Sequence, residues 1–534
     1  MGYALIWVEC LAAALLLVAW LVACTARSPR LVARVGLPAL AALLLVAAAG
    51  GLSCLLWLGR SSGLFPLWSC WYFLGWAVAL TVGLAVLLCQ GWKRQAGRAW
   101  PRGSLALALG VAAALACITF SNLDLAIKVQ LAAVRTESGA KALALLPPRV
   151  ADQDNAAPLY KAAFEALKPP DELPSPWKEK AKLWLDPRAQ FDFQDKDLAA
   201  FLKDQERGVV QLWGAASRAG YSFNRDHFAS AEVLIPELQK LRRAAALLSL
   251  DARARARRGD WSNARTSIFA IFGIARHANE PLLICLAVSA DLCQLGVRTL
   301  QDVLAQPQIE PDAMLNFWGV ETVSYPESLR RGLRMEEVGV GLPFLLSVAD
   351  AGAGAGSQWF QDDLDPEGRW VLGSPFYRVF FLPDDLASYR RWMKAYQDLS
   401  TDSYRQMRED WGSLSQAYRE DRGGILTRLI LPDIEGCIVS AARADAALGL
   451  LHFARYVESY RATKGKYPDS IDELLRVYRH DLSIDPFDGK PLRFRRDGKD
   501  VVLYSVGPNG TDDGGVAGDE KGQSGDIVFR LRGR

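Results

Sequence analysis

The chain opens with four long apolar stretches separated by short polar segments, at residues 3–24, 35–58, 67–89 and 104–120. Each is close to the roughly 20 apolar residues that a helix needs to cross a bilayer. No basic residue precedes the first stretch and no small-residue cleavage pattern follows it, so we expect a retained span and not a signal peptide. The pattern predicts a transmembrane anchor of four helices over residues 1–122.

Beyond residue 122 the apolar positions recur every three or four residues, which is the period of amphipathic helices. A stalk continues from the last span and is expected to end at Pro147-Pro148. Residues 241–280 predict a helix, a Gly259-Asp260 turn and a second helix. This turn resembles that of a tetratricopeptide hairpin, but no second copy follows at a fixed period. We expect a mostly helical extracytoplasmic domain over residues 123–432.

Two segments of this helical domain depart from the simple pattern. Residues 336–378 are rich in glycine and alanine and lack periodicity, which predicts a long loop. Residues 384–420 interleave tyrosine and tryptophan with arginine and lysine at helical spacing. Such interleaving could bind an anionic polymer, but at this spacing it is more typical of a core stripe flanked by solvated charges.

The last hundred residues change to a pattern of one long helix followed by strands. The helix is expected over residues 433–464 with Gly465 as its C-cap, and Ser470 and Glu473 have the spacing of a capping box. Two strand patterns meet at Asp497-Gly498, which indicates a hairpin, and a third strand lies at the end. The predicted fold is therefore multi-domain: a four-helix anchor, an all-α central body, and an α+β module over residues 433–534 with a long helix and a small antiparallel sheet.

Charge is distributed unevenly along the chain. Residues 1–122 hold eight Lys and Arg and one acid, of 62 and 59 in the whole chain, so the first part carries +7 and the remainder −4. The basic residues lie mainly between the first and second and after the third stretch, which predicts that these loops are cytoplasmic and that the body lies outside the membrane. A slightly acidic body lacks the basic surface that nucleic acid requires.

The predicted spans contain very few polar groups, so we interpret them as an anchor and not as a transport path. Six of the nine cysteines lie in or beside the spans. Of the other three, Cys285 and Cys293 are eight residues apart on a predicted helix, too far for an undistorted disulfide. The body is therefore not expected to be built on disulfides.

The order of elements and turn residues at the end of the chain resembles the globular domain of the major pseudopilin of type II secretion. The residues that carry the resemblance are Tyr467-Pro468, Asp485-Pro486-Phe487, Gly489, Pro491, Tyr504-Ser505, Gly507, Asn509-Gly510 and Asp526-Ile527. It covers about 95 residues, 436–531. The whole chain also resembles large membrane proteins of planctomycete-type bacteria that share this ending, which implies no activity.

The chain also departs from that family. A pseudopilin begins with a processed leader and an apolar helix that packs into a filament. Here the corresponding helix lies late in the chain and carries Arg443, Asp445, His452 and Arg455. We therefore do not expect a filament subunit.

The resemblance implies a calcium site, because the terminal loop of the family binds calcium. In this chain the corresponding residues are Asp512, Asp513, Asp519 and Asp526, and carboxylate oxygens are the ligands that calcium prefers. The sequence of the loop differs from the family between residues 510 and 526. The alternative interpretation is a solvated acidic turn that folds without metal.

Few other residues suggest chemistry. Residues 362–368 match the start of an EF-hand loop, but Ser374 stands where its last ligand would be. The four histidines, His227, His277, His452 and His480, lie at no metal-ligand spacing and are expected to be surface or packing residues. The motifs of nucleophilic hydrolases, zinc proteases and nucleotide-binding loops are missing from the sequence.

These observations favour a non-enzymatic scaffold or interaction protein of the bacterial inner membrane, linked to secretion or envelope assembly. Its expected partners are the lipid bilayer and one or more envelope proteins. One alternative is a membrane-bound hydrolase of envelope polymer that uses carboxylates in residues 362–367 or the aromatic helix after residue 384. A second alternative is a transporter component, which would need a polar cavity between the spans.

Overall fold

The computed structural model describes residues 102–148, 150–187, 189–222, 235–317, 320, 323–351, 375–399, 403–421, 423–424, 426–478, 484–518 and 525–533. The first three predicted spans and the segment 362–368 lie outside these residues. The described residues belong to two compact units, one with residues up to 134 and 346–386, the other with residues 135–345 and 387–534.

The smaller unit contains the first part of a long helix, α5 (Arg102–Leu145), of 44 residues. The fourth predicted span lies in this helix, and the helix ends two residues before Pro147, as the sequence predicts. In the same unit, the Arg378 Nε atom lies 2.7 Å from a carboxylate oxygen of Asp124, which ties α16 (Pro375–Phe380) to α5.

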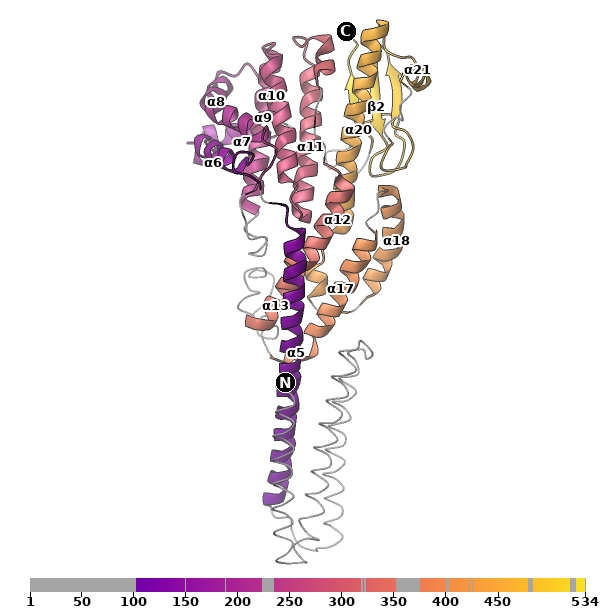
Figure 1. Ribbon diagram of the computed structural model, residues 1–534. Coiled ribbons are helices and arrows are strands. Elements are labelled where there is room, and N and C mark those ends of the chain that lie inside the picture. The colour runs from indigo at the N-terminus through magenta and orange to yellow at the C-terminus, as the bar shows by residue number, and fades with distance from the viewer. Residues whose placement is uncertain are drawn as a thin grey trace, which may run out of the picture. The chain divides into compact units, whose positions relative to one another are not determined.

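The larger unit is mostly helical, with a small sheet near the C-terminus (Figure 1). Its helices before the sheet region are α6 (Ala157–Ala166), α7 (Trp177–Leu185), α8 (Lys196–Ala216), α9 (Ile235–Arg257), α10 (Trp261–Ala278), α11 (Leu283–Leu304), α12 (Tyr325–Met335), most of α17 (Leu382–Leu399), and α18 (Tyr404–Glu420). The predicted mostly helical body with a small antiparallel sheet is therefore confirmed for the described residues.

The hairpin of α9 and α10 forms at the predicted turn. Gly259 has a φ of 75°, which favours glycine, and the Asp260 side chain accepts a hydrogen bond from the Asn263 amide to cap α10. Behind the turn, the buried Asp251 accepts hydrogen bonds from Arg255 Nε (2.8 Å) and Ser267 Oγ (2.6 Å). The Ser267 bond links α10 to α9, and the Arg255 bond, within α9, gives the buried carboxylate the partner that it needs.

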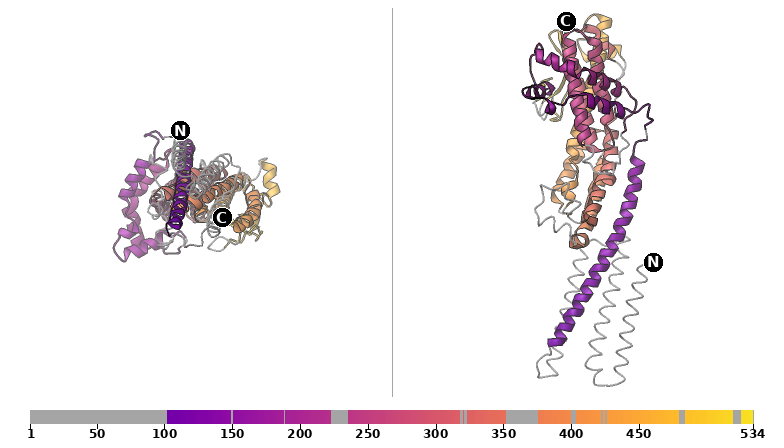
Figure 2. Two further views of the ribbon diagram at one scale, coloured as in Figure 1. Left: turned by 90° about the horizontal axis from the view of Figure 1, so that it is seen from below. Right: turned by 90° about the vertical axis from the view of Figure 1, so that its left-hand side faces the viewer.

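Helix α11 lies at the centre of the larger unit and packs against α9, α10, α12 and α20 (Figures 1 and 2). Glycine lets α11 pack closely on α10, because a Cβ on Gly296 would lie 2.8 Å from the Phe272 ring. Among the described residues, Leu283–Leu304 and Thr427–Lys464 are long and apolar enough to cross a membrane. Within the fold, 72% and 61% of their apolar windows are buried, as in core helices.

The predicted loop over residues 336–378 is wrong where the structure describes it. Residues Glu336–Gly341 form a π-helical turn that continues α12 into α13 (Leu342–Ala351), and α16 begins at Pro375. Residues 352–374 lie outside the described part. Glycine lowers helix propensity but permits close contact: a Cβ on Gly341 would lie 2.0 Å from the Tyr389 hydroxyl oxygen. Tertiary packing therefore overrides local composition here.

The C-terminal elements follow the predicted order. After the short α19 (Thr427–Ile430), the long helix α20 (Ile434–Lys464) is capped by Asp433 and ends at Gly465, whose φ is 73°. Helix α21 (Ile471–Val477) is capped by Ser470, as the capping-box spacing predicts.

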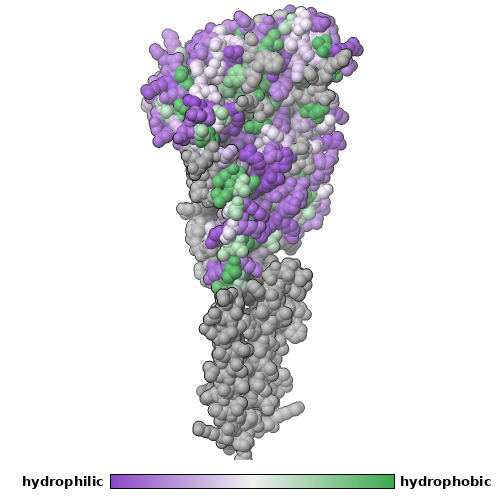
Figure 3. Space-filling view, viewed as in Figure 1, coloured by the Kyte–Doolittle hydropathy of each residue, from purple (hydrophilic) through white to green (hydrophobic). Residues whose placement is uncertain are grey.

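The strands β1 (Arg493–Asp497), β2 (Asp500–Ser505) and β3 (Ile527–Leu531) form one antiparallel sheet in the order β1-β2-β3. The hairpin turn at Asp497-Gly498 is confirmed by the pairing of Asp497 with Asp500. One face of the sheet packs on α20, and the exposed edge strand β1 carries three arginines, which discourages edge-to-edge association. On the molecular face shown in Figure 3, hydrophilic residues predominate and apolar ones form small separate patches.

Candidate functional site

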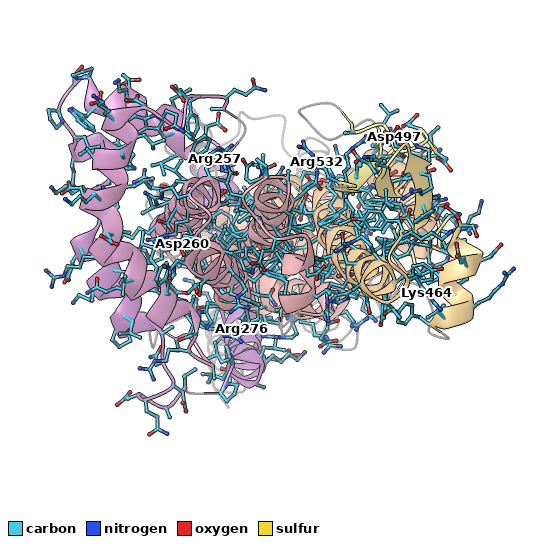
Figure 4. The ribbon with its side chains drawn as sticks, turned by 90° about the horizontal axis from the view of Figure 1, so that it is seen from above. Arg257, Asp260, Arg276, Lys464, Asp497 and Arg532 are labelled. Carbon is cyan, nitrogen blue, oxygen red and sulfur yellow. The ribbon has the colours of Figure 1, made fainter. Side chains whose placement is uncertain are left out.

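A cleft of about 510 Å³ opens where the C-terminal ends of α11 and α20 meet the strands. Its volume falls in the range of small-molecule binding pockets. The 3₁₀ helix η4 (Pro311–Asn316) borders it as well. Figure 4 looks onto this end of the larger unit and shows Arg532 between the end of α11 and the hairpin that carries Asp497.

Basic side chains outnumber acidic ones in this cleft. The cations that line it are Arg461, Lys466, Arg496, Lys499, Arg530 and Arg532. Only two carboxylates, Glu310 and Glu458, are among the lining residues. Like charges along a concave wall reinforce one another and raise the local concentration of opposite charge. Cations therefore outnumber acids among the described lining residues, while Asp312, Asp469, Asp497 and Asp500 pair with three of these cations from beside the cleft.

Three of the six cations already have carboxylate partners. The ion pairs are Arg461 with Glu458 and with Asp312 (both 2.6 Å), Lys466 with Asp469 (2.8 Å), and Arg530 with Asp497 (2.7 Å). The pair with Asp312 joins α20 to η4. These cations contribute mainly to the structure of the cleft walls.

The other three cations, Arg496, Lys499 and Arg532, have no carboxylate of the described residues within 4.0 Å. Arg532 donates a hydrogen bond to the Ala305 carbonyl at the end of α11 (3.4 Å), and Arg496 donates one to the Lys499 carbonyl (3.5 Å). Neutral carbonyls therefore hold the two guanidinium groups, and Asp469 acts on Arg496 only at longer range.

Tyr467 is the aromatic centre of the cleft wall. Its hydroxyl donates a hydrogen bond to Glu458 (2.6 Å) and lies 3.4 Å from the Arg532 carbonyl oxygen. The guanidinium carbons of Arg461 and Arg496 lie 5.7 and 5.6 Å from the ring centroid, within cation–π range. Burial raises the pKa of Tyr467, so the phenol stays protonated and keeps its donor role.

The predicted calcium ligands are only partly described. Asp512, Asp513 and Asp526 lie in the described residues, and Asp519 lies outside them. Within the described residues no three His, Cys, Asp or Glu side chains form a group that could hold a metal. Asp512 faces Arg493 at 3.6 Å, and an Asp513 oxygen accepts a hydrogen bond from Asn509 (3.0 Å).

Asp526 contacts the described part of the glycine-rich loop through its side chain. Its two oxygens accept hydrogen bonds from the amides of Asp513 (3.3 Å) and Gly515 (2.6 Å). Burial raises the pKa of its carboxyl group. These three carboxylates do not form a metal site, and calcium binding with Asp519 stays a prediction. Thermal melting of the full chain in calcium and in chelator tests it, and a calcium-dependent rise that Asp519→Asn removes would support it.

Asp485, in the Asp-Pro-Phe motif, has a structural role. It is fully buried and accepts hydrogen bonds from the Phe487 amide (3.0 Å), the Val506 amide (2.9 Å), Ser505 Oγ (2.9 Å) and Arg493 Nη1 (2.8 Å). One carboxylate thus fixes the start of the hairpin against the end of β2. The aspartate of the Asp-Pro-Phe motif therefore stabilises the fold of the module.

Two other buried acids lie in the helices. Burial raises the pKa of Glu336 to about 7 and that of Asp445 to about 6. Asp445 accepts a hydrogen bond from the Tyr404 hydroxyl (2.7 Å). Neither acid lines the cleft, so they do not provide the paired, accessible carboxyls that a hydrolase would need there.

His277 is a packing residue, as the sequence predicts. Its Nδ1 atom lies 2.9 Å from the Tyr160 hydroxyl, and its Nε2 atom lies 3.0 Å from the Arg218 carbonyl oxygen. Burial, with the nearby Arg276 charge, lowers the pKa of His277 to about 4. The ring is therefore neutral near pH 7 and joins α6, α10 and the end of α8. His227 and His480 lie outside the described residues.

The cleft residues were not singled out from the sequence. They come from the end of α20, the hairpin turn and the last strand, and no fixed spacing relates them. The one available signal was the density of arginine and lysine in residues 493–499 and 530–534.

Comparison of the chain with known protein families, with curated proteins and with solved structures finds no match in any of the three.

Proposed function

We propose that this protein is a membrane-anchored, extracytoplasmic interaction protein of the bacterial envelope, in which the basic cleft is the recognition site. The observation that carries the proposal is a set of three cations in a concave site that have no carboxylate partner among the described residues. A site of this kind suits binding, since it offers unpaired charge to a partner of opposite sign.

A catalytic function has less support in this cleft. Of its two carboxylates, Glu458 is buried and engaged by Arg461 and Tyr467. Among the described residues that line the cleft there is no cysteine, histidine or serine, so they do not supply a nucleophile with an adjacent base. The alternative of an envelope hydrolase would use residues 362–367, which lie outside the described residues.

The membrane part of the proposal comes from the sequence. Four apolar stretches lie in residues 1–122, and basic residues gather in the first and third of the loops between them. This pattern predicts a multi-pass inner-membrane protein with its body outside. We expect the full chain to remain in the membrane pellet after alkaline carbonate extraction. A chain that begins at residue 123 should be extracted, and its retention in the pellet would contradict the anchor.

The C-terminal module is proposed as the pseudopilin-like part that presents this cleft. Its helix α20 packs on α11 of the helical body, and the cleft lies between them, so both parts contribute walls. The module would then act in protein contact or envelope assembly. Its long helix α20 lies late in the chain and carries charged residues, which favours a fixed domain over a filament subunit.

Site-specific photo-crosslinking in intact membranes tests recognition at the cleft. The photoreactive residue p-benzoylphenylalanine replaces Glu310, which lines the cleft and leaves its cations intact. The control replaces Arg495, which is exposed on β1 and does not line the cleft. We expect a discrete product at position 310 that Lys499→Gln weakens. Equal products at both positions would contradict recognition by the cleft.

A further inference from the structure

We propose that the cleft binds a phosphate-bearing ligand, with Arg496, Lys499 and Arg532 holding a phosphate or diphosphate group. This inference deepens the proposed function, since it assigns a ligand class to the same cleft. A phosphate group carries about −1.5 to −2 charge near neutral pH and offers several acceptor oxygens. Three cations without carboxylate partners match a multiply charged anion better than a single carboxylate.

The backbone gives these three cations fixed origins. In the sheet, Arg496 pairs with Val501, and Val501 pairs with Leu531. The side chains of this row of paired residues therefore share one face. Lys499 lies in the hairpin turn beside this row, and Arg532 follows Leu531 directly. Arg495 belongs to the opposite face. Arg496, Lys499 and Arg532 therefore lie at the same end of the sheet, beside the cleft that all three line.

Two neighbouring groups position the arginines. The Tyr467 ring holds the Arg496 guanidinium by a cation–π contact, and the Ala305 carbonyl holds Arg532. Arginine presents a planar set of N–H donors that matches phosphate oxygens in pairs. Because neutral partners hold the guanidinium groups, binding need not break an existing ion pair.

The cleft is larger than a phosphate group. Its volume is about 510 Å³, and roughly 10–15 Å³ on the same measure is enough to hold one water molecule. Leu304, Met314 and Leu531 add apolar wall beside the cations. The site therefore has room for an organic group attached to the phosphate, which can be a soluble organic phosphate or a phospholipid headgroup.

The probe for the first test is inorganic pyrophosphate, titrated calorimetrically into the full chain in nanodiscs of phosphatidylcholine. We expect saturable binding that weakens as salt is added. Arg496→Gln and Lys499→Gln should each raise the Kd by roughly tenfold, since each removes a charge-assisted contact. Arg495→Gln is the matched control from the same strand and should leave the Kd within about twofold.

Lys499→Gln also protects the test against misfolding. Lys499 is exposed and makes no ion pair among the described residues, whereas Arg496 contacts Tyr467. Arg496→Lys keeps the charge and should recover part of the affinity. Equal losses for Arg495→Gln and Arg496→Gln, or no binding at millimolar pyrophosphate, would overturn the assignment. So would tighter binding of a glutamate-rich peptide.

Two further arms distinguish the sources of the phosphate. Phosphatidic acid, a phosphate monoester, competes with pyrophosphate from the nanodisc when the ligand is a headgroup. A soluble sugar phosphate competes in phosphatidylcholine nanodiscs when the ligand is soluble. Both results support the phosphate class. If pyrophosphate does not bind but the crosslinked product at position 310 is found, the phosphate assignment is wrong and the proposed function is supported. If neither binding nor the crosslinked product is found, both proposals are contradicted.

Discussion

At the residue scale, several polar groups that the sequence singled out have structural roles. Asp485 and Asp526 accept backbone amides, and His277 joins three helices. The sequence singled out Asp485 as part of a turn motif and Asp526 as a calcium ligand. It could not show their roles, because hydrogen bonds to residues 11 to 21 positions away depend on how the chain folds back.

Replacement of Asp485 by alanine should lower the free energy of unfolding by about 3 kcal/mol. The change leaves two buried amides, a hydroxyl and part of the Arg493 guanidinium without their acceptor. Urea unfolding of the full chain, followed by circular dichroism, measures the loss. Asp472→Ala, at an exposed position of the same module, should change it by no more than about 0.5 kcal/mol.

His277 should make the protein less stable in acid. Its pKa in the folded state is about 4, below the ordinary value of 6.5, so the unfolded chain binds a proton more readily between these values. The contribution is fully present above pH 6.5 and is lost as pH falls toward 4, by about 3 kcal/mol in total.

The variant His277→Gln isolates this effect from the buried acids Glu336 and Asp445. Their raised pKa values act in the opposite direction, since their contribution is lost as pH rises through about 7 and about 6. The melting temperature of the variant should depend less on pH between 6.5 and 4 than that of the wild type. Parallel curves for both proteins would contradict the assignment.

At the element scale, helix ends and turns could be predicted because their signals are local. Gly465 and Ser470 cap helices where the sequence placed them, and Asp433, expected as the first helical residue, is the N-cap of α20. The segment after residue 336 was predicted wrongly for a physical reason. Its glycines lower helix propensity, but the contact of Gly341 with Tyr389 stabilises a π-helical turn that no local pattern reveals.

Replacement of Gly341 by alanine should destabilise the protein by about 2 kcal/mol. The new Cβ would lie 2.0 Å from the Tyr389 hydroxyl oxygen, so the ring must move and its hydrogen bond to the Glu336 carbonyl (3.1 Å) is lost. Gly412→Ala in the exposed part of α18 meets no atom within 4 Å and should stabilise by up to about 1 kcal/mol. Thermal melting of the two variants compares them, and similar melting temperatures would argue against a packing role for Gly341.

At the scale of the whole molecule, the sequence pattern separated the helical body from the C-terminal module, whereas the structure joins them in one unit. Helix α20 packs on α11, and Arg461 links α20 to η4 through Asp312. The basic cleft exists only because of this packing. No reading of residues 493–533 alone could therefore have found its walls or its volume.

This joining predicts that the body and the module open together. Amide hydrogen exchange, followed by mass spectrometry, should give α11 and β2 similar protection, because they share a core through α20. Arg461→Ala should lower the protection of both segments, since it leaves the buried Glu458 carboxylate without its cation and removes the link to Asp312. Arg495→Ala, at an exposed position, should change neither. If β2 instead exchanged far faster than α11, the module would be an independent folding unit, and the cleft would open whenever the module unfolds.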